Sequence, residues 1–342
     1  MRRRLLLWGG AGVLLLLVSM TVSLSIGTVR LPFLQVWGIL AHHLPWIGHS
    51  IPADWQPAAE QIIWRVRLPR VLLGLLVGAA LGVAGAAFQG VLRNPLADPY
   101  TLGVSSGAAL GASFLILFGL QFAFGSWTIP VIAFITAAAS LLSVLLLART
   151  DGQLKMGTVL LAGVVMHSFL GSFVSLMVAM SKQVINEILF WMMGSLSLRG
   201  WSYTLVLLPY LAAGAAVLLM YGRALNLFAL GEAQAAHLGV RVERTKLIVL
   251  TAATLVTAAA VSVSGVVAFV GLIVPHLLRM LIGPDYRLLL PLSLLGGAIY
   301  VLWADTIARM LLSPTEIPLG VVTAFMGAPF FAYLLRKNKR TG

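Results

Sequence analysis

Acidic residues are scarce in this chain, and their positions decide whether the sequence can carry ion-coupled or acid–base chemistry. The 342 residues include ten Asp and Glu side chains, and nine of the ten fall in predicted loops or at predicted helix ends. Only Asp305 lies near the end of a predicted membrane-spanning segment, four residues before Arg309. Because ionisable residues inside a span are the usual mark of a proton or sodium relay, their near-absence argues against an ion-coupled secondary transporter.

Histidine, cysteine and lysine residues show no catalytic or cofactor-binding pattern. The six histidines have no metal-ligand spacing beyond the adjacent pair His42 and His43, and His167 is expected to be a hydrogen-bonded interior residue. The chain has no cysteine, which excludes disulfides and thiolate ligands. None of the five lysines follows a glycine, so there is no Gly-x-x-x-x-Gly-Lys phosphate-binding loop. We expect no cofactor in this chain, and any ATP that drives it must be hydrolysed by another chain.

Basic residues are numerous but scattered. The net charge is +13, yet Lys and Arg occur singly at the ends of apolar segments and are not interleaved with aromatic residues on one polar face. This distribution does not indicate nucleic-acid binding. In membrane proteins an excess of Lys and Arg marks the cytoplasmic side of the bilayer. The basic clusters at residues 2–4 and 336–340 therefore predict that both termini are cytoplasmic.

Most of the chain is apolar enough to lie in lipid, with 60% hydrophobic and 10% charged residues. Apolar stretches of about 18 or more residues recur, each long enough to cross a hydrocarbon core of about 30 Å as a helix. We therefore predict an all-α polytopic membrane protein in which residues 1–342 form a single transmembrane domain. The first apolar run is expected to be a retained helix, because it is too long for a signal peptide and lacks a clear cleavage site. About ten transmembrane helices are predicted, at Leu5–Ile26, Val71–Val91, Leu102–Leu120, Ile129–Leu147, Val159–Met180, Tyr203–Leu219, Leu247–Ser264, Val266–Leu281, Leu288–Thr306 and Leu319–Leu335.

Small residues repeat in the second predicted span. Gly74, Gly78 and Gly82 follow one another at a spacing of four residues. Helices in lipid gain little from burying apolar side chains, so they associate through small residues that let their backbones approach closely. We therefore expect this face to be a buried helix contact.

Three segments between the predicted spans stand out by composition. Residues 27–64 are rich in Pro, Trp and His and are predicted to lie at the outer face. The amphipathic segment Ile185–Trp191 is predicted to lie along the outer surface. Residues 224–240, bounded by Gly231 and Gly239 in their second half, are predicted to form two short helices joined at a glycine on the inner face. An ATPase on another chain would need a contact surface of this kind on the present chain. The alternative is that this segment is an ordinary helix at the membrane interface.

Eight short motifs are spread along the chain: RLPR at 67–70, NPLADP at 94–99, LGVSSGA at 102–108, LAG at 161–163, WMMG at 191–194, ALGE at 229–232 continuing to LG at 238–239, GLIVPH at 271–276 and PLGVVTA at 318–324. Together they resemble one family of membrane proteins, the permeases for uptake of iron–siderophores, haem and cobalamin. The similarity covers residues 65–335, nearly the whole chain, and depends on the combination of motifs.

The resemblance implies the type II fold of ABC importer permeases, built from inverted repeats, in the bacterial inner (cytoplasmic) membrane. It implies two permease chains, identical or different, around a central pathway. Two cytoplasmic ATP-binding subunits would lie below them and an extracytoplasmic substrate-binding protein above. The residues implied are Gly231, Glu232, Ala233, Leu238 and Gly239 for ATPase coupling, Asn94, Leu96, Met156 and Gly157 for a cytoplasmic gate, and Arg67, Arg70 and Arg309 for docking of the binding protein.

Two other classes of protein remain as alternatives. An ion-coupled secondary transporter of a small hydrophobic or chelate substrate would need a coupling carboxylate or a ligand-lined helix break. A membrane-embedded enzyme would need a carboxylate pair or a histidine cluster. Within the importer family the resemblance favours iron(III)–siderophore as substrate, followed by haem or cobalamin, and the residues themselves do not choose among them.

Overall fold

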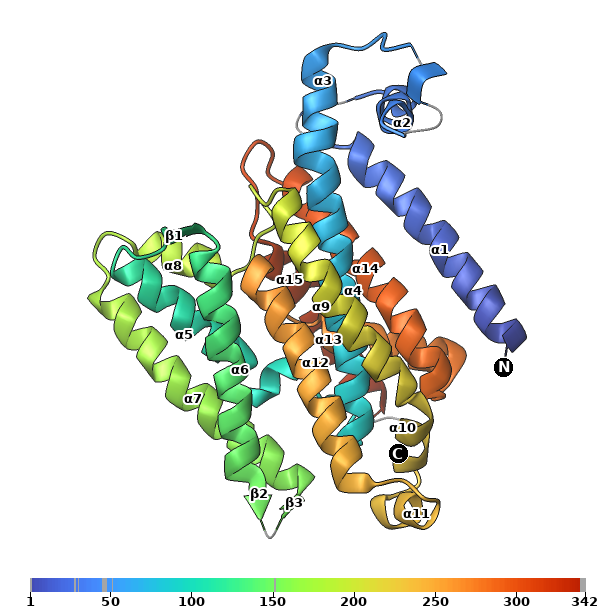
Figure 1. The fold of residues 1–342 in the computed structure, drawn as a ribbon, viewed down its shortest axis with the longest axis vertical. Coiled ribbons are helices and arrows are strands. Elements are labelled where there is room, and N and C mark those ends of the chain that lie inside the picture. Colours follow the sequence, from blue (N-terminus) through green and yellow to red (C-terminus); the bar gives the residue numbers. More distant parts are fainter. Residues whose placement is uncertain are drawn as a thin grey trace.

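The protein is almost entirely helical, and the computed structural model describes residues 2–27, 29, 31–44, 48–50, 52–150 and 152–338 (Figure 1). Parts of the predicted outer-face segment 27–64 and the last two residues of the basic cluster at 336–340 therefore lie outside the described residues. The elements are α1 (Arg2–Ser25), α2 (Phe33–His42), η1 (Gly48–Ser50), α3 (Pro57–Gln61), the π-helical turn η2 (Ile62–Arg67), α4 (Leu68–Val91), η3 (Pro99–Leu102), α5 (Val104–Leu117), β1 (Ala123–Ser126), α6 (Thr128–Ala148), the hairpin β2 (Arg149–Thr150) and β3 (Gln153–Leu154), α7 (Met156–Met180), α8 (Ile185–Met192), α9 (Trp201–Met220), α10 (Gly222–Phe228), α11 (Glu232–His237), α12 (Val242–Ser264), α13 (Val270–Ile282), α14 (Tyr286–Met310) and α15 (Leu319–Asn338).

Helix α4 lies at the centre of the bundle and is buried along almost its whole length. Helices α9, α12, α13 and α14 surround it, while α5, α6 and α7 form a group on one flank and α1 lies on the other, against α14 (Figure 1). This arrangement leaves α1 and α7 with most of their surface uncovered by the rest of the chain.

Backbone contacts through glycine hold α4 against its neighbours. A Cβ atom on Gly78 would lie 2.1 Å from the carbonyl oxygen of Gly297 in α14, and one on Gly85 would lie 1.9 Å from that of Gly271 in α13. A Cβ atom at either distance would clash with the carbonyl oxygen, so only glycine permits these helix crossings. The predicted small-residue face is thus confirmed as a buried contact, in the way expected of helices that pack in lipid.

The predicted spans correspond to helices, but the number that can cross a membrane alone is smaller than ten. Among the described residues, seven helices are long and apolar enough to do so. Helices α5 and α13 have 14 and 13 residues, so α13 extends only about 20 Å at 1.5 Å per residue. The predicted span Val266–Leu281 was therefore too long. Its first residues belong to a non-helical stretch at 265–269 that separates α12 from α13.

A tyrosine satisfies the backbone at this break. The hydroxyl of Tyr100, in η3, donates a hydrogen bond to the Val267 carbonyl oxygen over 3.1 Å and accepts one from the Val267 amide over 3.3 Å. Unpaired backbone groups are costly away from water, so an irregular stretch within a bundle needs such a partner. The pairing also fixes the loop before α5 against the turn before α13.

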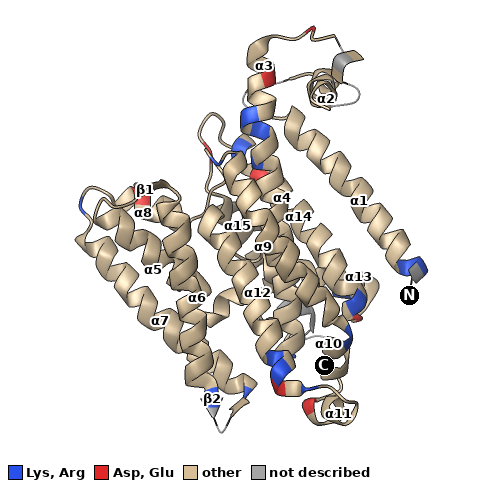
Figure 2. Cartoon of the chain, viewed as in Figure 1, with Lys and Arg blue, Asp and Glu red and all other residues tan. Residues whose placement is uncertain are grey.

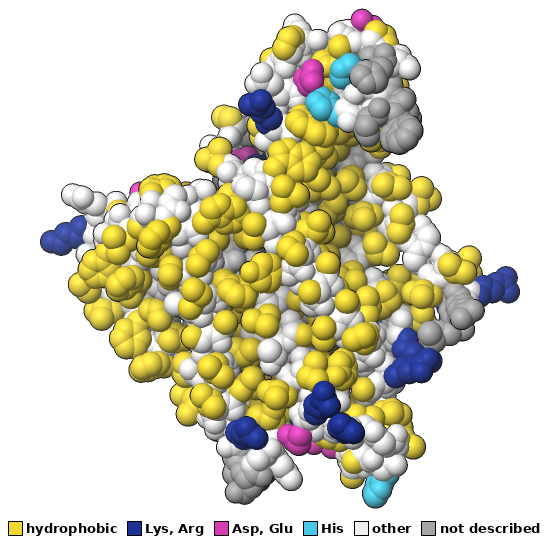
Figure 3. Space-filling model, viewed as in Figure 1, with side chains coloured by type: hydrophobic (Ala, Val, Ile, Leu, Met, Phe, Trp, Pro, Cys, Tyr) yellow, Lys and Arg dark blue, Asp and Glu magenta, His cyan; other side chains and the backbone are white. Residues whose placement is uncertain are grey.

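Charged residues gather at two opposite ends of the molecule, with an apolar belt between them (Figures 2 and 3). One end carries α2 and α3, and we call it the α2–α3 end. The other carries α10, α11 and the β2–β3 hairpin, and we call it the α10–α11 end. The belt is the surface expected to contact the hydrocarbon core of a bilayer, and the two charged ends are expected to contact water.

Candidate functional site

Helices α10 and α11 form an exposed elbow at the α10–α11 end of the molecule (Figure 1). Gly231 joins them with a φ of +111°, a backbone conformation that favours glycine. The predicted pair of short helices meeting at a glycine is thus confirmed as structure. The role of the elbow in ATPase coupling stays a prediction.

The outer surface of the elbow is made of small and apolar side chains. Ala233, Leu238 and Gly239 are exposed, and Leu230 and Leu238 each expose 59% of their surface. Ala235, on the opposite side of α11, is buried. Exposed apolar side chains grouped at a charged, water-facing end indicate a contact surface for another protein.

Helix α10 is fastened to the turn before α14. Asn226 donates a hydrogen bond to Asp285 Oδ1 over 2.6 Å and accepts one from the Tyr286 amide over 2.8 Å. Asp285 in turn accepts a hydrogen bond from the Arg287 amide and caps α14. The hydrogen bonds from Arg287 are the main reason that the pKa of Asp285 is lowered to about 2, so this carboxylate is ionised at neutral pH. The first arm of the elbow is therefore fixed to the bundle.

Helix α11 is fastened to the bundle through a buried lysine. Lys246, near the start of α12, has only 2% of its surface exposed. Its ammonium group lies 2.7 Å from Glu232 Oε2, 2.9 Å from Glu243 Oε1 and 2.9 Å from the Leu154 carbonyl oxygen. Of the predicted coupling residues, Glu232 thus points toward the bundle, while Ala233, Leu238 and Gly239 face outward. Lys246 was not predicted as a functional residue, although the spacing of Glu243 and Lys246 fits an ion pair on one helix.

The predicted gate residues lie in two segments that border this lysine cluster. Asn94 and Leu96 lie in the turn after α4, where the Asn94 side chain accepts a hydrogen bond from the Leu96 amide over 2.9 Å. Arg93, just before them, lies 3.7 Å from Glu232 Oε1. Leu96 is 44% exposed.

The other two gate residues begin α7, directly after the β2–β3 hairpin. Met156 is half-buried, and Gly157 is exposed with open space where a Cβ atom would lie. No hydrogen bond or ion pair joins these two residues to Asn94 or Leu96 within the described part of the chain. Their gate role stays a prediction.

A second charged cluster, at the α2–α3 end, contains two of the three predicted docking arginines. The guanidinium group of Arg70 donates to Asp305 Oδ1 over 2.9 and 3.1 Å, and to Glu316 over 2.8 and 3.0 Å. Arg309 Nε lies 3.1 Å from Asp305 Oδ2. Burial of Glu316 raises its pKa, but hydrogen bonds from Arg70 and Ser197 outweigh this effect and hold the pKa below its usual value. One buried carboxylate thus lies between two buried arginines.

The arginines also hold the end of α1. Arg67 donates to the Leu24 carbonyl oxygen over 2.7 Å, and Arg309 donates to Ser23 Oγ over 2.8 Å. The last carbonyl groups of a helix have no partners within the helix and carry partial negative charge, so a guanidinium group there satisfies and stabilises them. Arg67, Arg70 and Arg309, to which the resemblance assigns a docking role at the outer face, are all buried and bonded within the chain. Their docking role stays a prediction.

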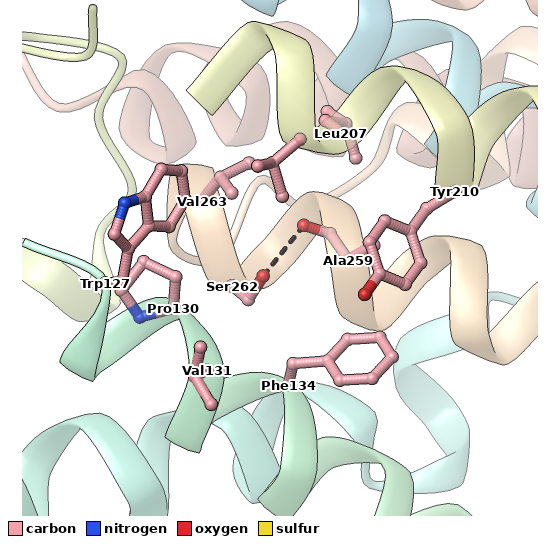
Figure 4. Close-up of a pocket in the computed structure, with 10 residues that line it drawn as sticks. Trp127, Pro130, Val131, Phe134, Leu207, Tyr210, Ala259, Ser262 and Val263 are labelled. Atoms are coloured by element: carbon pink, nitrogen blue, oxygen red, sulfur yellow. Dashed lines mark hydrogen bonds between the residues drawn. The ribbon is translucent and has the colours of Figure 1, made fainter. Parts of the chain in front are cut away.

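One apolar cavity and one exposed histidine lie away from the two charged clusters. A cavity of about 130 Å³ between α6, α9 and α12 is lined by Trp127, Phe134, Tyr210 and aliphatic side chains (Figure 4). The hydroxyl of Ser262 in its wall already donates to the Ala259 carbonyl oxygen over 2.9 Å. His167 is hydrogen-bonded to Ser106 over 2.7 Å, as expected, but the residue is exposed on α7 and is not interior to this chain. No group of three or more His, Asp or Glu side chains could hold a metal ion among the described residues.

Comparisons with known proteins agree on one family. The model of the FecCD transport family matches residues 15–337. The chain is 42% identical to the cobalamin import system permease protein of Halobacterium salinarum, over 88% of this chain and 82% of that protein. It is 39% identical to the hemin transport system permease protein of Yersinia pestis, over 96% of each chain. A solved structure, described as an inward-facing conformation of a metal-chelate type ABC transporter, superposes with a TM-score of 0.82 at 33% identity, covering 98% of this chain and 100% of that one.

Replacing Asp305 by Asn should destabilise the α2–α3 end of the molecule. The change removes the carboxylate that Arg70 and Arg309 share, and breaking a buried ion pair by removing one partner costs about 3–5 kcal/mol. Thermal unfolding of the purified protein in detergent measures the loss. Glu316→Gln is the matched control, because the Glu316 side chain is 36% exposed and should cost much less. Equal losses in the two variants would contradict this account of the cluster.

Proposed function

Because the chain belongs to the FecCD transport family, we propose that it is the membrane-spanning permease subunit of an ATP-driven importer for a metal chelate. The observation that carries this proposal is the family match over residues 15–337, which includes the exposed α10–α11 elbow as well as the bundle. The chain is a multi-pass membrane protein, and the basic residues near its ends favour a cytoplasmic location for both termini. It performs no covalent chemistry of its own in this proposal.

The ATP-hydrolysing subunit is proposed to bind the elbow at the α10–α11 end. Its contact surface would be Ala233, Leu238 and Gly239, with Leu230 beside them, because these side chains are exposed and small or apolar. Fixing of α10 through Asn226 supports this assignment, since a contact that transmits force must be attached firmly at its base.

The substrate-binding protein is proposed to dock at the α2–α3 end, near Arg67, Arg70 and Arg309. Arg70 and Arg309 are balanced by two carboxylates, Asp305 and Glu316, whereas Arg67 bonds only to backbone carbonyl oxygens, so this region keeps one positive charge in excess. An acidic side chain on the partner would complement that charge and would set mainly the docking register and the association rate. Glu316, the more exposed of the two acids, would compete with it.

A second permease chain is proposed to complete the pathway. Helix α7 leaves most of its surface uncovered, including Ser168, Ser172 and Ser175, and polar side chains in a span are expected to face protein or a water-filled path. Asn94, Leu96, Met156 and Gly157 would then close the cytoplasmic end of that path by side-chain occlusion. Passive leak of substrate from loaded vesicles reports on this closure.

The substrate is proposed to be an iron(III)–siderophore, with haem and cobalamin as the next candidates. The named relatives carry hemin and cobalamin, and both are bulky metal chelates. No observation favours the ion-coupled secondary transporter considered from the sequence, because the described helices carry no Asp or Glu side chain in their central turns (Figure 2).

Uptake should depend on ATP and should be independent of the proton gradient. Vesicles that contain the complete importer with its ATPase and binding protein would be loaded with ATP, and a protonophore would then collapse the gradient at constant ATP. We expect chelate uptake to continue, because the helices in the described part of the chain carry no Asp or Glu in their central turns that could relay protons. Loss of uptake with ATP unchanged would support a secondary transporter and overturn the proposal.

Replacing Leu238 by Asp should weaken binding of the ATPase subunit without affecting the fold. The side chain is 59% exposed, so the folded permease loses little, whereas a charge placed in an apolar contact is costly to desolvate. We expect a loss of affinity of about tenfold or more, equivalent to at least 1.4 kcal/mol, measured by co-purification and by binding to nanodiscs. Leu44→Asp, a similarly exposed leucine at the opposite end, is the control. Unchanged ATPase binding by the Leu238 variant would remove the elbow from the interface.

Replacing Glu316 by Gln should strengthen binding of the substrate-binding protein. The change raises the excess charge of the arginine cluster by one and frees part of Arg70 for a partner carboxylate. The gain should shrink as salt rises, because exposed charges are screened beyond about 8–10 Å at physiological ionic strength. Affinity measured in nanodiscs across a salt series tests this expectation. Unchanged or weaker affinity would count against docking through these arginines.

A further inference from the structure

We propose that Lys246 and Glu232 are positioning residues that transmit movement of α11 to the two segments of the cytoplasmic gate, Lys246 to the start of α7 and Glu232 to the turn after α4. This inference rests on the proposed function and deepens it, because it names the internal connection between the ATPase contact and the pathway. Lys246 does not touch the ATPase or the substrate. It acts through the residues bonded to it, namely Glu232 on α11, Glu243 on α12 and Leu154 on the β2–β3 hairpin.

Lys246 places a full charge at a buried position where apolar packing would cost less free energy. Lys246 is among the largest fully buried side chains of the described chain. A buried ion pair is seldom more stable than well-packed apolar residues of the same size, so it contributes little to stability in itself. What the ammonium group provides is three directed hydrogen bonds. Each of the three is used, and each goes to a different segment or turn of the chain.

The β2–β3 hairpin is bonded to α12 through Leu154, whose backbone amide and carbonyl groups both have partners there. The Leu154 amide donates to Glu243 Oε2 over 2.7 Å, and the Leu154 carbonyl oxygen accepts from Lys246. Met156, the first residue of α7, follows two residues later. A displacement of Lys246 therefore acts directly on the start of α7, where half of the predicted gate lies.

Helix α11 is also connected to the other predicted gate segment, the turn that contains Asn94 and Leu96. Glu232 uses one carboxylate oxygen for Lys246 at 2.7 Å and directs the other toward Arg93 at 3.7 Å. Arg93 lies in the turn after α4 and immediately precedes Asn94. Glu232 is thus the only residue of α11 with an ion pair in the described chain. One partner, Arg93, lies beside the Asn94 segment, and the other, Lys246, bonds to Leu154 just before the α7 segment.

Glu232 and Lys246 are placed so that they can move together with α11. The Glu232 side chain is 33% exposed, whereas that of Lys246 is 2% exposed, so the helix carrying Glu232 lies at the surface and the lysine lies behind it. Pushing or pulling α11 changes the position of Glu232 first. Lys246 then carries the change to Leu154, while Arg93 carries it to the Asn94 turn.

The test compares substrate transported per ATP hydrolysed in the complete importer reconstituted in vesicles. Lys246→Met and Glu232→Gln should each lower this ratio by about tenfold, the size of a typical coupling between two sites. ATP hydrolysis should fall less than transport does. Lys246→Arg, which keeps the charge, should restore part of the ratio. Lys155→Met, an exposed lysine beside the hairpin with no ion pair in the described chain, is the matched control and should leave the ratio unchanged.

A second measurement separates transmission from simple stabilisation. Hydrogen–deuterium exchange of the complete importer with and without ATP should change in both α11 and the hairpin in the unmodified protein. In Glu232→Gln, which leaves Lys246 paired with Glu243, the ATP-dependent change should remain in α11 and disappear from residues 149–154.

The outcomes that overturn the inference differ from those that overturn the proposed function. A normal transport ratio in the Lys246 and Glu232 variants, or equal falls in hydrolysis and transport, would show that the cluster only supports the fold. The same conclusion would follow if the hairpin still responded to ATP in Glu232→Gln. Failure of the unmodified importer to use ATP for uptake would instead reject the proposed function.

Discussion

The close contact of glycine backbones around α4 is the constraint on which the rest of the structure depends. Gly78 against Gly297 and Gly85 against Gly271 bring α4 within backbone distance of α14 and α13. In lipid, apolar side chains gain little free energy when they move into the protein interior. Close backbone packing therefore holds these helices together in place of the hydrophobic effect. Because α4 is fixed in this way, Arg70 near its start and Arg93 just after its end are held at the two charged ends of one rigid helix. The two candidate functional regions are thus joined by a single element.

The helices and the elbow could be predicted from the sequence, because hydropathy and glycine spacing report on local structure. The end of α12 at Ser264 was predicted, but the start of α13 was not, since residues 266–269 are apolar and their non-helical backbone is supported by Tyr100, which is 167 residues away from Val267 in sequence. The other features that the sequence did not reveal depend on hydrogen bonds and ion pairs between residues that are distant in the sequence. Lys246 looks like an ordinary basic residue at a helix start until Leu154 and Glu232 are placed beside it. Arg67 likewise looks exposed until the end of α1 is placed over it.

The outer arginines illustrate how one set of residues can serve both fold and function. Arg67 and Arg309 bond to the final turn of α1, and Arg70 bonds to two carboxylates. Such bonds hold the guanidinium groups in fixed directions, which favours recognition of a planar carboxylate on a partner. Burial within the chain and a role at an interface are therefore compatible, provided that a partner competes with Glu316 and leaves Asp305 in place.

The apolar belt between the two charged ends has an electrical consequence. Moving one elementary charge across a bilayer at 100 mV involves about 2.3 kcal/mol, so a membrane protein responds to voltage only through charges that cross the field. Between the two ends, the described helices carry no Lys, Arg, Asp or Glu side chain in their central turns (Figure 2). Rearrangement of this bundle would therefore displace almost no charge through the field. A change in the cell's membrane potential would act on the passenger, through whatever net charge that molecule carries, and scarcely on the protein.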